Sequence, residues 1–444
     1  MTKKKRHFGL FVYLGIELRN FVFSGLSERL SEFADVSIIS HQQADVFQEL
    51  VASKNLNLIK IPYRNVLDNY RGKIEGYFLS VRRARLRLKG RVVFNLWHNT
   101  IPKRVKDYFI GNSVVYLLYQ IASTFEIRNR YYNEILADLI LQNKITDIIL
   151  QSYFSIENMT IAITAQKLGC RIWVVNWSWK DLYINEYIPF NPDGFFTWSE
   201  RLKELYQSSN KHINAARIKA IGNISYDRMI NYQPSRDRSY YATKYSFDIG
   251  KPILLYTMVH PRIFPDEQLI ALRIAQSLED QNLNFVILMK PNPMDTNWER
   301  FKSVERHSTL VTLENLWFYD KASDFNMITD EGQTEWLDLI YYSVANISVA
   351  STVTIEYLVM NKPVINILFE NDNKQHPEFV RLFNSPFYGI LHNRKDVIGC
   401  YTVTDVIDVL KDVHSFSGKN ESLDDIIISN GQSLERFVNQ VKEA

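Results

Sequence analysis

Cysteine is scarce in this chain, since its 444 residues include only two. Cys170 and Cys400 lie far apart and match no metal-binding or redox spacing. A disulfide framework is therefore excluded, and a reducing compartment is the default expectation. A long apolar run is also missing, because no segment is both long enough and hydrophobic enough to span a bilayer. We therefore expect a cytoplasmic protein.

We do not expect a cleavable leader at the start of the sequence. The basic run Met1–Arg6 resembles the start of a signal peptide, but the apolar stretch behind it, Phe8–Ile16, is short and contains glycines. It ends in Glu17, and no small-residue cleavage site follows. We predict a first strand and its loop here.

An excess of charge of one sign is missing too. Lys and Arg number 52 against 49 Asp and Glu, which gives a formal net charge of +3. This charge is too weak to indicate nucleic-acid binding. Hydrophobic residues make up 46% of the chain, enough for a large core, and the length suits two domains rather than one.

What the chain does have is an alternation of strand and helix patterns in each half. This predicts an α/β fold with two parallel-sheet domains that face one another across a cleft. We expect an N-terminal domain over residues 1–230, a polar linker over 231–249, a C-terminal domain over 250–415 and a helical tail over 416–444. The expected strands are Phe8–Leu14, Asp35–Ser40, Asn57–Pro62, Val92–Leu96, Asp147–Gln151, Arg171–Asn176, Gly194–Trp198, Ile218–Ile221, Pro252–Tyr256, Phe285–Met289, Ser308–Val311, Asn346–Ala350 and Val364–Leu368. The expected helices are Phe21–Phe33, a long region from Lys103 to Asn143, Glu157–Leu168, Asp266–Gln281, Glu335–Tyr342, Thr354–Met360 and Val403–Lys411.

The strand near Ser348 ends in small hydroxyl residues that open a helix. Ser351, Thr352 and Thr354 supply hydroxyl donors at a helix end where the first amides lack partners and the dipole is positive. Glu356 follows, and its carboxylate could accept hydrogen bonds from paired ribose hydroxyls. Open α/β sheets bind ligands at the carboxyl ends of their strands. The stretch therefore predicts a nucleotide diphosphate site, with an ordinary helix cap as the alternative.

Three more motifs occur in the second half. Ala220–Asp227 carries Gly-Asn followed by an Asp, Leu255–Arg262 is a strand and loop ending in His-Pro-Arg, and Leu288–Pro293 reads Leu-Met-Lys-Pro-Asn-Pro. Together with the hydroxyl turn, these motifs resemble the nucleotide-sugar glycosyltransferases with two Rossmann-like domains, the GT-B architecture. The same resemblance extends to their UDP-N-acetylglucosamine 2-epimerase relatives.

Two motifs of the first half add to this resemblance. The segments Trp177–Leu182 and Pro192–Glu200 are similar to Ser-Trp-Asp-Asn-Leu and Pro-Asp…Trp-Ser/Asn-Glu of bacterial surface-polysaccharide transferases. Some positions depart from the family pattern: Lys180 replaces an Asp, and Asn292 replaces a His. The hydroxyl turn lacks the epimerase pattern Asp-Ser-Gly-Gly-x-x-Glu-Glu, which counts against an epimerase. It also lacks the Asp-Tyr-Ser-Ser form of polyol-phosphate transferases.

The resemblance implies chemistry in which a nucleotide diphosphate departs, without a cofactor or a bound metal. Cationic side chains and helix amides would stabilise the developing charge. Arg262 and Lys290 both follow predicted strands of the second half, so they are candidates for phosphate contacts, with solvated surface charges as the alternative.

An inverting transferase needs a general base on the acceptor hydroxyl. Glu17 follows the first strand and is a candidate base, with Arg19 and Asn20 placed to position acceptor or phosphate. Glu17 could equally cap the next helix. Asp181 is a rival base. His98, after another predicted strand, is better explained as an ordinary loop histidine.

Two tryptophans and a basic stretch remain. Trp177 and Trp179 could stack on an acceptor sugar, or they could pack in the core. The runs Arg82–Arg91 and Lys103–Lys106 make the first half locally basic beside an aromatic segment. This clustering suggests docking on anionic lipid, with a solvated helix face as the alternative.

The sequence as a whole predicts a glycosyltransferase of bacterial surface-polysaccharide assembly, acting in lipopolysaccharide O-antigen or capsule synthesis. Its partners would be a nucleotide sugar, a glycan or lipid-linked acceptor, and the cytoplasmic face of the inner membrane. A polyol-phosphate transferase using a CDP-linked donor and a non-catalytic nucleotide- or sugar-binding subunit of the same fold are the alternatives.

Overall fold

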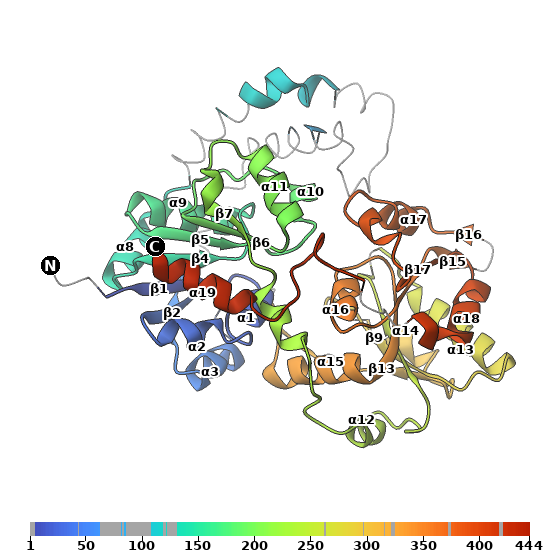
Figure 1. Cartoon of the computed structure of the whole chain (residues 1–444). Coiled ribbons are helices and arrows are strands. Elements are labelled where there is room, and N and C mark those ends of the chain that lie inside the picture. The colour runs from blue at the N-terminus through green and yellow to red at the C-terminus, as the bar shows by residue number, and fades with distance from the viewer. Residues whose placement is uncertain are drawn as a thin grey trace. The chain divides into compact units, whose positions relative to one another are not determined.

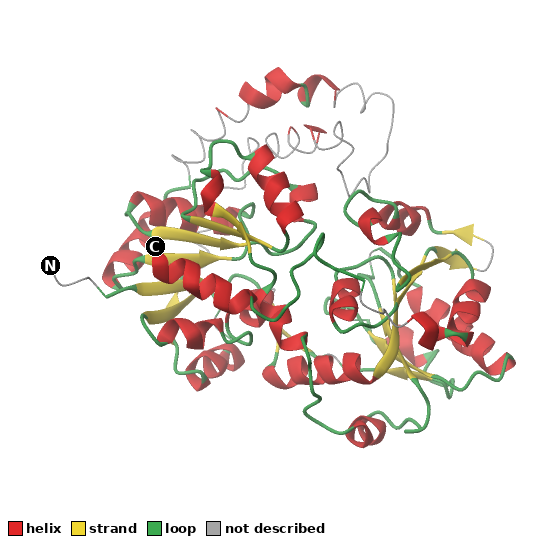
Figure 2. Cartoon of the chain, in the orientation of Figure 1, coloured by secondary structure: helices red, strands yellow, loops and turns green. Residues whose placement is uncertain are grey.

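The computed structural model describes residues 5–42, 44–62, 81, 84–85, 108–118, 121, 131–261, 263–295, 297–314, 316–320, 325–371, 374–416 and 421–444. The described residues form two compact units (Figure 1). Unit 1 comprises residues from 1–227, 320–325 and 424–444, and unit 2 comprises residues from 228–319 and 326–423. Each unit is built on its own parallel sheet with helices around it (Figure 2).

The sheet of unit 1 has seven strands in the order β3-β2-β1-β4-β5-β6-β7, and all its pairs are parallel. Its central strands are buried along nearly their whole length, as parallel sheets covered on both faces require. The strands are β1 (His7–Phe11), β2 (Asp35–Ser40), β3 (Asn57–Lys60), β4 (Asp147–Leu150), β5 (Arg171–Val175), β6 (Gly194–Thr197) and β7 (Ile218–Ala220). The helices are α1 (Gly15–Phe21), α2 (Leu26–Ser31), α3 (Asp45–Ser53), α8 (Glu134–Gln142), α9 (Ile156–Lys167), α10 (Asp181–Ile184), α11 (Glu200–Ser209) and α19 (Ser433–Glu443).

The sheet of unit 2 has six strands in the order β10-β9-β8-β13-β14-β17, again all parallel. Its strands are β8 (Ile253–Thr257), β9 (Val286–Lys290), β10 (Leu310–Thr312), β13 (Ser343–Ser348), β14 (Val364–Ile367) and β17 (Val397–Cys400). Its helices are α12 (Arg238–Lys244), α13 (Glu267–Asp280), α14 (Glu299–Lys302), α15 (Asp330–Tyr342), α16 (Val353–Val359), α17 (Pro377–Phe383) and α18 (Val403–Lys411). Two short pairs are formed by β11 (Trp317–Asp320) with β12 (Phe325–Ile328) and by β15 (Phe369–Asn371) with β16 (Lys374–Gln375).

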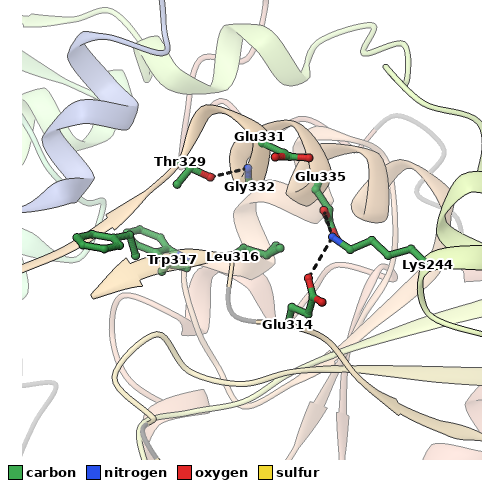
Figure 3. Close-up of a pocket in the computed structure, with 9 residues that line it drawn as sticks. Lys244, Glu314, Leu316, Trp317, Thr329, Glu331, Gly332 and Glu335 are labelled. Atoms are coloured by element: carbon green, nitrogen blue, oxygen red, sulfur yellow. Dashed lines mark hydrogen bonds and ion pairs between the residues drawn. The ribbon is translucent and has the colours of Figure 1, made fainter. Parts of the chain in front are cut away.

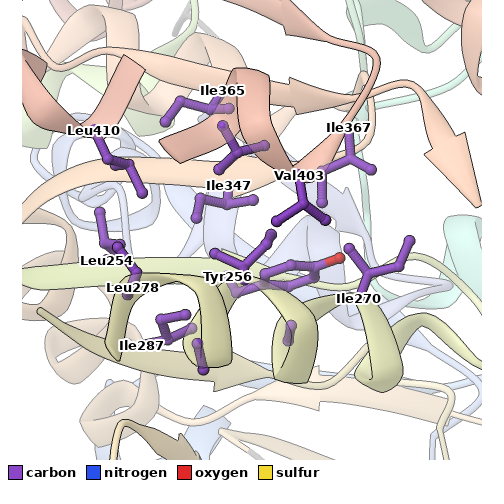
Figure 4. Packing of buried hydrophobic residues seen from close by; sticks show 14 of the residues in the cluster. Leu254, Tyr256, Ile270, Leu278, Ile287, Ile347, Ile365, Ile367, Val403 and Leu410 are labelled. Carbon is purple, nitrogen blue, oxygen red and sulfur yellow. The ribbon is translucent and has the colours of Figure 1, made fainter. Parts of the chain in front are cut away.

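The main core of unit 2 lies on one face of its sheet, under helices α13 and α18 (Figure 4). Tyr256, Ile347 and Ile365 stand side by side in the register of three neighbouring strands, so their side chains point to the same face. Each is fully buried there. The residues one position further along each strand therefore point to the opposite face.

The C-terminal segment packs on unit 1. Asp227 accepts a hydrogen bond at 2.8 Å from the backbone N–H of Leu434, at the start of α19. Gly222 has φ +96°, and a Cβ there would lie 2.3 Å from the Ser433 hydroxyl and 2.5 Å from the Ile428 carbonyl oxygen. Only glycine suits this position. The Gly-Asn…Asp motif thus holds the last helix against the first unit.

The stretch that we expected to be a linker, 231–249, contains helix α12 and belongs to unit 2. The buried carboxylate of Asp338 on α15 anchors it. Its oxygens accept hydrogen bonds from the hydroxyls of Tyr232 at 2.7 Å and Tyr241 at 2.6 Å, and from the backbone N–H groups of Ser235 at 2.8 Å and Arg236 at 3.1 Å. These hydrogen bonds, together with the buried side chains of Tyr241, Ala242 and Tyr245, dock the stretch on unit 2.

The expected helix Phe21–Phe33 is shorter in the structure: only α2 lies within this range, and the chain turns before it at Gly25 with φ +84°. Helix α1 lies almost wholly before the expected start. The expected strand Val92–Leu96 lies outside the described residues, as does much of the expected helical region 103–143. Among the described residues, no helix combines the length and the hydropathy needed to cross a membrane.

Candidate functional site

Each sheet has one place where the strand order reverses. In unit 1 this switch point lies between β1 and β4, and in unit 2 between β8 and β13. The connections that follow the two neighbouring strands there lead to opposite sides of the sheet, which opens a crevice at the carboxyl ends of the strands. Of the sequence-predicted site residues, Glu17, Arg19 and Asn20 follow β1, and the hydroxyl turn with Glu356 follows β13.

A row of polar side chains crosses the carboxyl edge of the unit 2 sheet. Lys290 on β9 is in register with Thr257 on β8, which is in register with Ser348 on β13 and, through it, with Asn366 on β14. All four point away from the α13–α18 core and toward the face covered by α15 and α16. The row therefore spans the switch point of this unit.

One buried hydroxyl of this row and another in the turn beyond it have no hydrogen-bond partner in the part of the chain that the structure describes. They are Ser348 Oγ, at the end of β13, and Ser351 Oγ, in the turn that follows. Thr352 stands at the N-cap of α16, is partly exposed, and makes no side-chain cap within the described residues. An unpartnered buried hydroxyl is costly, so these groups are suited to a polar ligand.

Thr354 does not face this site. Its hydroxyl is fully buried and lies 2.7 Å from the Tyr388 hydroxyl, which in turn donates to Asn366 Oδ1 at 3.0 Å. Through this hydrogen bond, Thr354 connects α16 to the segment that follows α17. We do not retain it among the candidate ligand contacts.

Glu356 and Lys290 both contact Trp336, a residue that the sequence analysis did not predict for the site. Glu356 Oε2 accepts a hydrogen bond at 2.8 Å from the indole N–H of Trp336 on α15, and Lys290 Nζ lies 5.1 Å from the centre of the Trp336 ring. Trp336 is twenty positions from Glu356 and carries no local signal. Only the packing of α15 beside β8 brings it to the edge of the sheet. Arg262 lies outside the described residues.

In unit 1, Glu17 lies on α1, directly after β1. Burial raises the pKa of its carboxyl to about 8, although the backbone N–H of Leu14, 2.7 Å from Oε2, favours the charged form. The hydrogen bond to Leu14 is the helix-capping contact that we had considered as the alternative role. A pKa near neutrality also suits a group that takes up and releases a proton.

Glu157, at the start of α9, was not predicted. Its carboxylate acts across the switch point and raises the pKa of Glu17 further. The sequence signal was available, since Ser155 caps a helix directly after the buried strand β4. Glu157 is the counterpart of Glu17 on the other side of the crevice.

The two neighbours of Glu17 on α1 differ in their surroundings. The Arg19 guanidinium carbon lies 5.6 Å from the centre of the Tyr226 ring, a cation–π contact within unit 1. Asn20 is buried, and its Oδ1 has no hydrogen-bond partner among the described residues. Asn20 lies three positions from Glu17 and shares its helix face.

Asp181 closes the turn after β5. Its Oδ2 accepts hydrogen bonds from the Ser178 N–H at 2.8 Å and the Asn176 side chain at 2.7 Å. Burial raises the pKa of Asp181 to about 7, more than these donors lower it. The geometry gives Asp181 a clear role in holding the tryptophan motif in place.

The two tryptophans of that motif have different environments. Trp179 is 2% exposed and packs inside unit 1, as in the core-packing alternative. Trp177 is partly exposed, and its ring is stacked on Phe154 with the centroids 6.5 Å apart. Of the pair, only Trp177 presents a ring to which a sugar could bind.

A separate pocket of about 320 Å³ lies at the start of α15 in unit 2 (Figure 3). Lys244 points into it, with Nζ 2.8 Å from Glu335 and 3.4 Å from Glu314. Because Lys244 pairs with both of these carboxylates and Glu331 pairs with Arg236, we assign this pocket no ligand. It is lined by Lys244, Glu314, Leu316, Trp317, Phe318, Thr329, Glu331, Gly332 and Glu335.

The raised pKa of Glu17 predicts a pH dependence of stability. An unfolded glutamate loses its proton near pH 4.5, whereas folded Glu17 keeps its proton up to about pH 8. The folded state binds more protons in this window, so the free energy of unfolding falls as pH rises, by up to about 1.4 kcal/mol per pH unit. Glu17→Gln is expected to flatten this slope in thermal unfolding between pH 5 and 8. Parallel curves for the two proteins would contradict the raised pKa.

Solved structures with a similar fold include two that were determined with UDP or UDP-GlcNAc and one glycosyltransferase. The S. aureus MnaA–UDP co-structure has a TM-score of 0.58 at 12% identity, covering 99% of this chain and 96% of its own. A UDP-GlcNAc 2-epimerase from Neisseria meningitidis bound to UDP-GlcNAc has a TM-score of 0.57 at 10% identity, covering 99% and 100%. A glycosyltransferase from Rickettsia africae has a TM-score of 0.53 at 13% identity, covering 99% and 98%. No protein-family model and no curated protein matches this sequence. The expected α/β fold with two parallel-sheet domains, the GT-B type, is therefore confirmed.

Proposed function

We propose that this protein is an enzyme that binds a nucleotide-activated sugar on unit 2 and transfers the sugar to a bacterial surface glycan. The observation that carries this proposal is the polar row at the carboxyl edge of the unit 2 sheet. Together with the turn after β13, the row combines a cation, two buried hydroxyls without partners among the described residues, and a switch-point location.

In this proposal the diphosphate lies against Lys290 and the hydroxyls of Ser348, Ser351 and Thr352. These groups oppose the negative charge that builds up on the departing nucleotide. Glu356, held by Trp336, is proposed to accept hydrogen bonds from the ribose. Arg262 keeps its proposed phosphate role from the sequence motif alone. We expect no metal or cofactor in this chemistry.

Unit 1 supplies the proposed proton transfer. Glu17 has its pKa raised to about 8 by burial, so it exchanges a proton near physiological pH and is the proposed base for the acceptor hydroxyl. Asn20 and Arg19 are proposed to position the acceptor, and Trp177 to stack on its sugar ring. Asp181 remains a rival base, although its hydrogen bonds within the turn favour a positioning role.

The second candidate is a nucleotide-sugar epimerase. It is favoured by the structural likeness to UDP-GlcNAc 2-epimerases, over 99% of this chain. The hydroxyl turn, Ser351–Glu356, favours transfer instead, because it lacks the double glutamate that the epimerase pattern carries.

Deuterium exchange separates the two reactions. Inversion at C2 of a sugar breaks a C–H bond, so an epimerase in D₂O would incorporate deuterium at C2 of UDP-GlcNAc without any acceptor. A transferase would leave that position unlabelled and release nucleotide only when an acceptor is added. We expect the second result by NMR, and C2 labelling would replace our first proposal by the epimerase.

Nucleotide binding tests the proposed site itself. We expect one nucleotide among UDP, GDP, CDP, CMP and dTDP, or its sugar derivative, to raise the thermal unfolding midpoint. In Lys290→Met the Kd of that nucleotide should rise about ten- to a hundredfold, because one charge-assisted contact is lost. Lys302→Met is the matched control, since Lys302 is an exposed lysine of α14 in the same unit.

The screen also tests the two earlier alternatives. Selective binding of CDP or CMP, with transfer of a phosphorus-containing group, would favour the polyol-phosphate transferase. Binding without turnover, insensitive to Glu17→Gln, would favour the non-catalytic subunit. Equal loss of affinity in Lys290→Met and Lys302→Met would remove Lys290 from the site.

A further inference from the structure

Four buried amide side chains follow three neighbouring strands of the unit 1 sheet, β1, β4 and β5. In each amide the side-chain oxygen is buried and has no hydrogen-bond partner among the described residues. The amides are Asn20 on α1 at 6% exposure, Gln151 directly after β4 at 1%, Asn158 on α9 at 2% and Asn176 directly after β5 at 2%. A buried acceptor without a donor is costly, so this set at one edge of a sheet indicates a bound ligand or ordered water.

Asn176 shows which end of its amide lacks a partner. Its Nδ2 donates to the Ser178 carbonyl oxygen at 2.8 Å and to Asp181 Oδ2 at 2.7 Å. Because a carbonyl oxygen can only accept hydrogen bonds, the nitrogen end is fixed and Oδ1 is the end left over. The group that satisfies Asn176 Oδ1 must therefore donate a hydrogen.

Two aromatic rings accompany these amides. Phe154 follows Gln151 by three residues, in the turn that leads into α9. Trp177 is the next residue after Asn176. Both rings are partly exposed, and they lie nearly parallel, with 25° between their planes and their centroids 6.5 Å apart. The edge thus combines flat apolar surface with buried acceptors that need donors.

We propose that this edge of unit 1 binds an uncharged pyranose of the acceptor glycan. The sugar hydroxyls would donate to the amide oxygens, and one C–H face of the ring would lie on Phe154 or Trp177. A phosphate or a carboxylate fits less well, because its oxygens accept hydrogen bonds and would face further acceptors. The inference rests on the proposed transfer to a glycan. It adds Gln151, Asn158, Asn176 and Phe154 to the proposed acceptor residues.

Saturation-transfer NMR tests this inference without any turnover. We expect the ring protons of neutral methyl hexopyranosides to receive saturation from the natural chain, and glycerol 3-phosphate to receive little. Gln151→Met keeps the length of the side chain but removes the oxygen, so the glycoside Kd should rise about three- to tenfold. The thermal midpoint and the nucleotide Kd should stay unchanged, since that oxygen has no described hydrogen bond to lose. Gln142→Met is the matched control, because Gln142 is an exposed residue at the end of α8.

The aromatic rings need a variant of their own. Phe154→Leu/Trp177→Leu removes both ring faces and should abolish the saturation of the sugar ring protons. Phe33→Leu changes another partly exposed ring of unit 1, at the end of α2, and should bind glycosides as the natural chain does.

The proposal would be overturned if no neutral glycoside received saturation, or if glycerol 3-phosphate received as much. Equal losses in Gln151→Met and Gln142→Met would also contradict it. A lower thermal midpoint of Gln151→Met with an unchanged glycoside Kd would assign the amide oxygens to ordered water inside the fold. Glycoside binding by a chain that transfers no sugar would instead support this site and remove the proposed transferase activity.

Discussion

Glu17→Gln is expected to lower turnover by about two to four orders of magnitude while nucleotide affinity stays unchanged. Removal of a positioned acid–base group has this effect, since glutamine cannot exchange a proton. The amide oxygen of glutamine can still accept the hydrogen bond from Leu14 N–H, so helix α1 keeps its cap. Initial rates and calorimetric Kd values for the same preparations provide the measurement.

Two comparisons sharpen this prediction. Glu49→Gln changes an exposed glutamate of α3 in the same unit and should leave the rate unaltered. Asp181→Asn should lower stability and rate together, because Asp181 holds the turn between Asn176 and Ser178. If Asp181→Asn abolished turnover in a fully stable protein while Glu17→Gln remained active, the base would be Asp181.

Asp338→Ala is expected to destabilise unit 2 by about 3–5 kcal/mol, because four donors, among them the buried Tyr241 hydroxyl, lose a charged acceptor. The thermal midpoint of a unit of this size should fall by about 10 °C. Asp408→Ala, on α18, removes an exposed ion pair to Lys411 and should cost less than about 1 kcal/mol. Equal midpoints for the two variants would mean that segment 231–245 is held by something other than Asp338.

Local patterns predicted most of the sheet. Each buried strand is a short apolar run bounded by turns, and these runs alternate with helices. The end of each run marks the carboxyl end of a strand, so the carboxyl edges of both sheets could be located from the sequence. The turn after β13 was found for the same reason, since Ser348 and Ser351 lie within a few residues of one strand end.

Contacts between distant segments could not be predicted. Trp336 reaches Glu356 only because α15 and α16 cover the same face of the sheet, and Asp338 finds its four donors in a segment about a hundred residues earlier. The sequence also could not predict the direction in which a side chain of the hydroxyl turn points. Nothing local distinguishes Thr354, which bonds to Tyr388, from Ser351, whose hydroxyl has no partner among the described residues.

The two tryptophans show how burial decides between roles. Trp177 and Trp179 flank the same residue, Ser178, yet only Trp177 is partly exposed. The chain turns at Ser178, whose N–H donates to Asp181, so the side chains on either side of it leave in different directions. A turn has no regular spacing of apolar residues, so the sequence does not indicate which of the two tryptophans is buried.

The central claim is that a nucleotide binds on unit 2 while proton transfer belongs to unit 1. The most direct test is calorimetric titration of the nucleotide that the screen selects into the natural chain, Lys290→Met and Glu17→Gln, with turnover measured on the same samples. We predict one nucleotide per chain, affinity lost in Lys290→Met alone, and turnover lost in both variants. Unchanged affinity in Lys290→Met, or no binding of any nucleotide to the natural chain, would contradict the account.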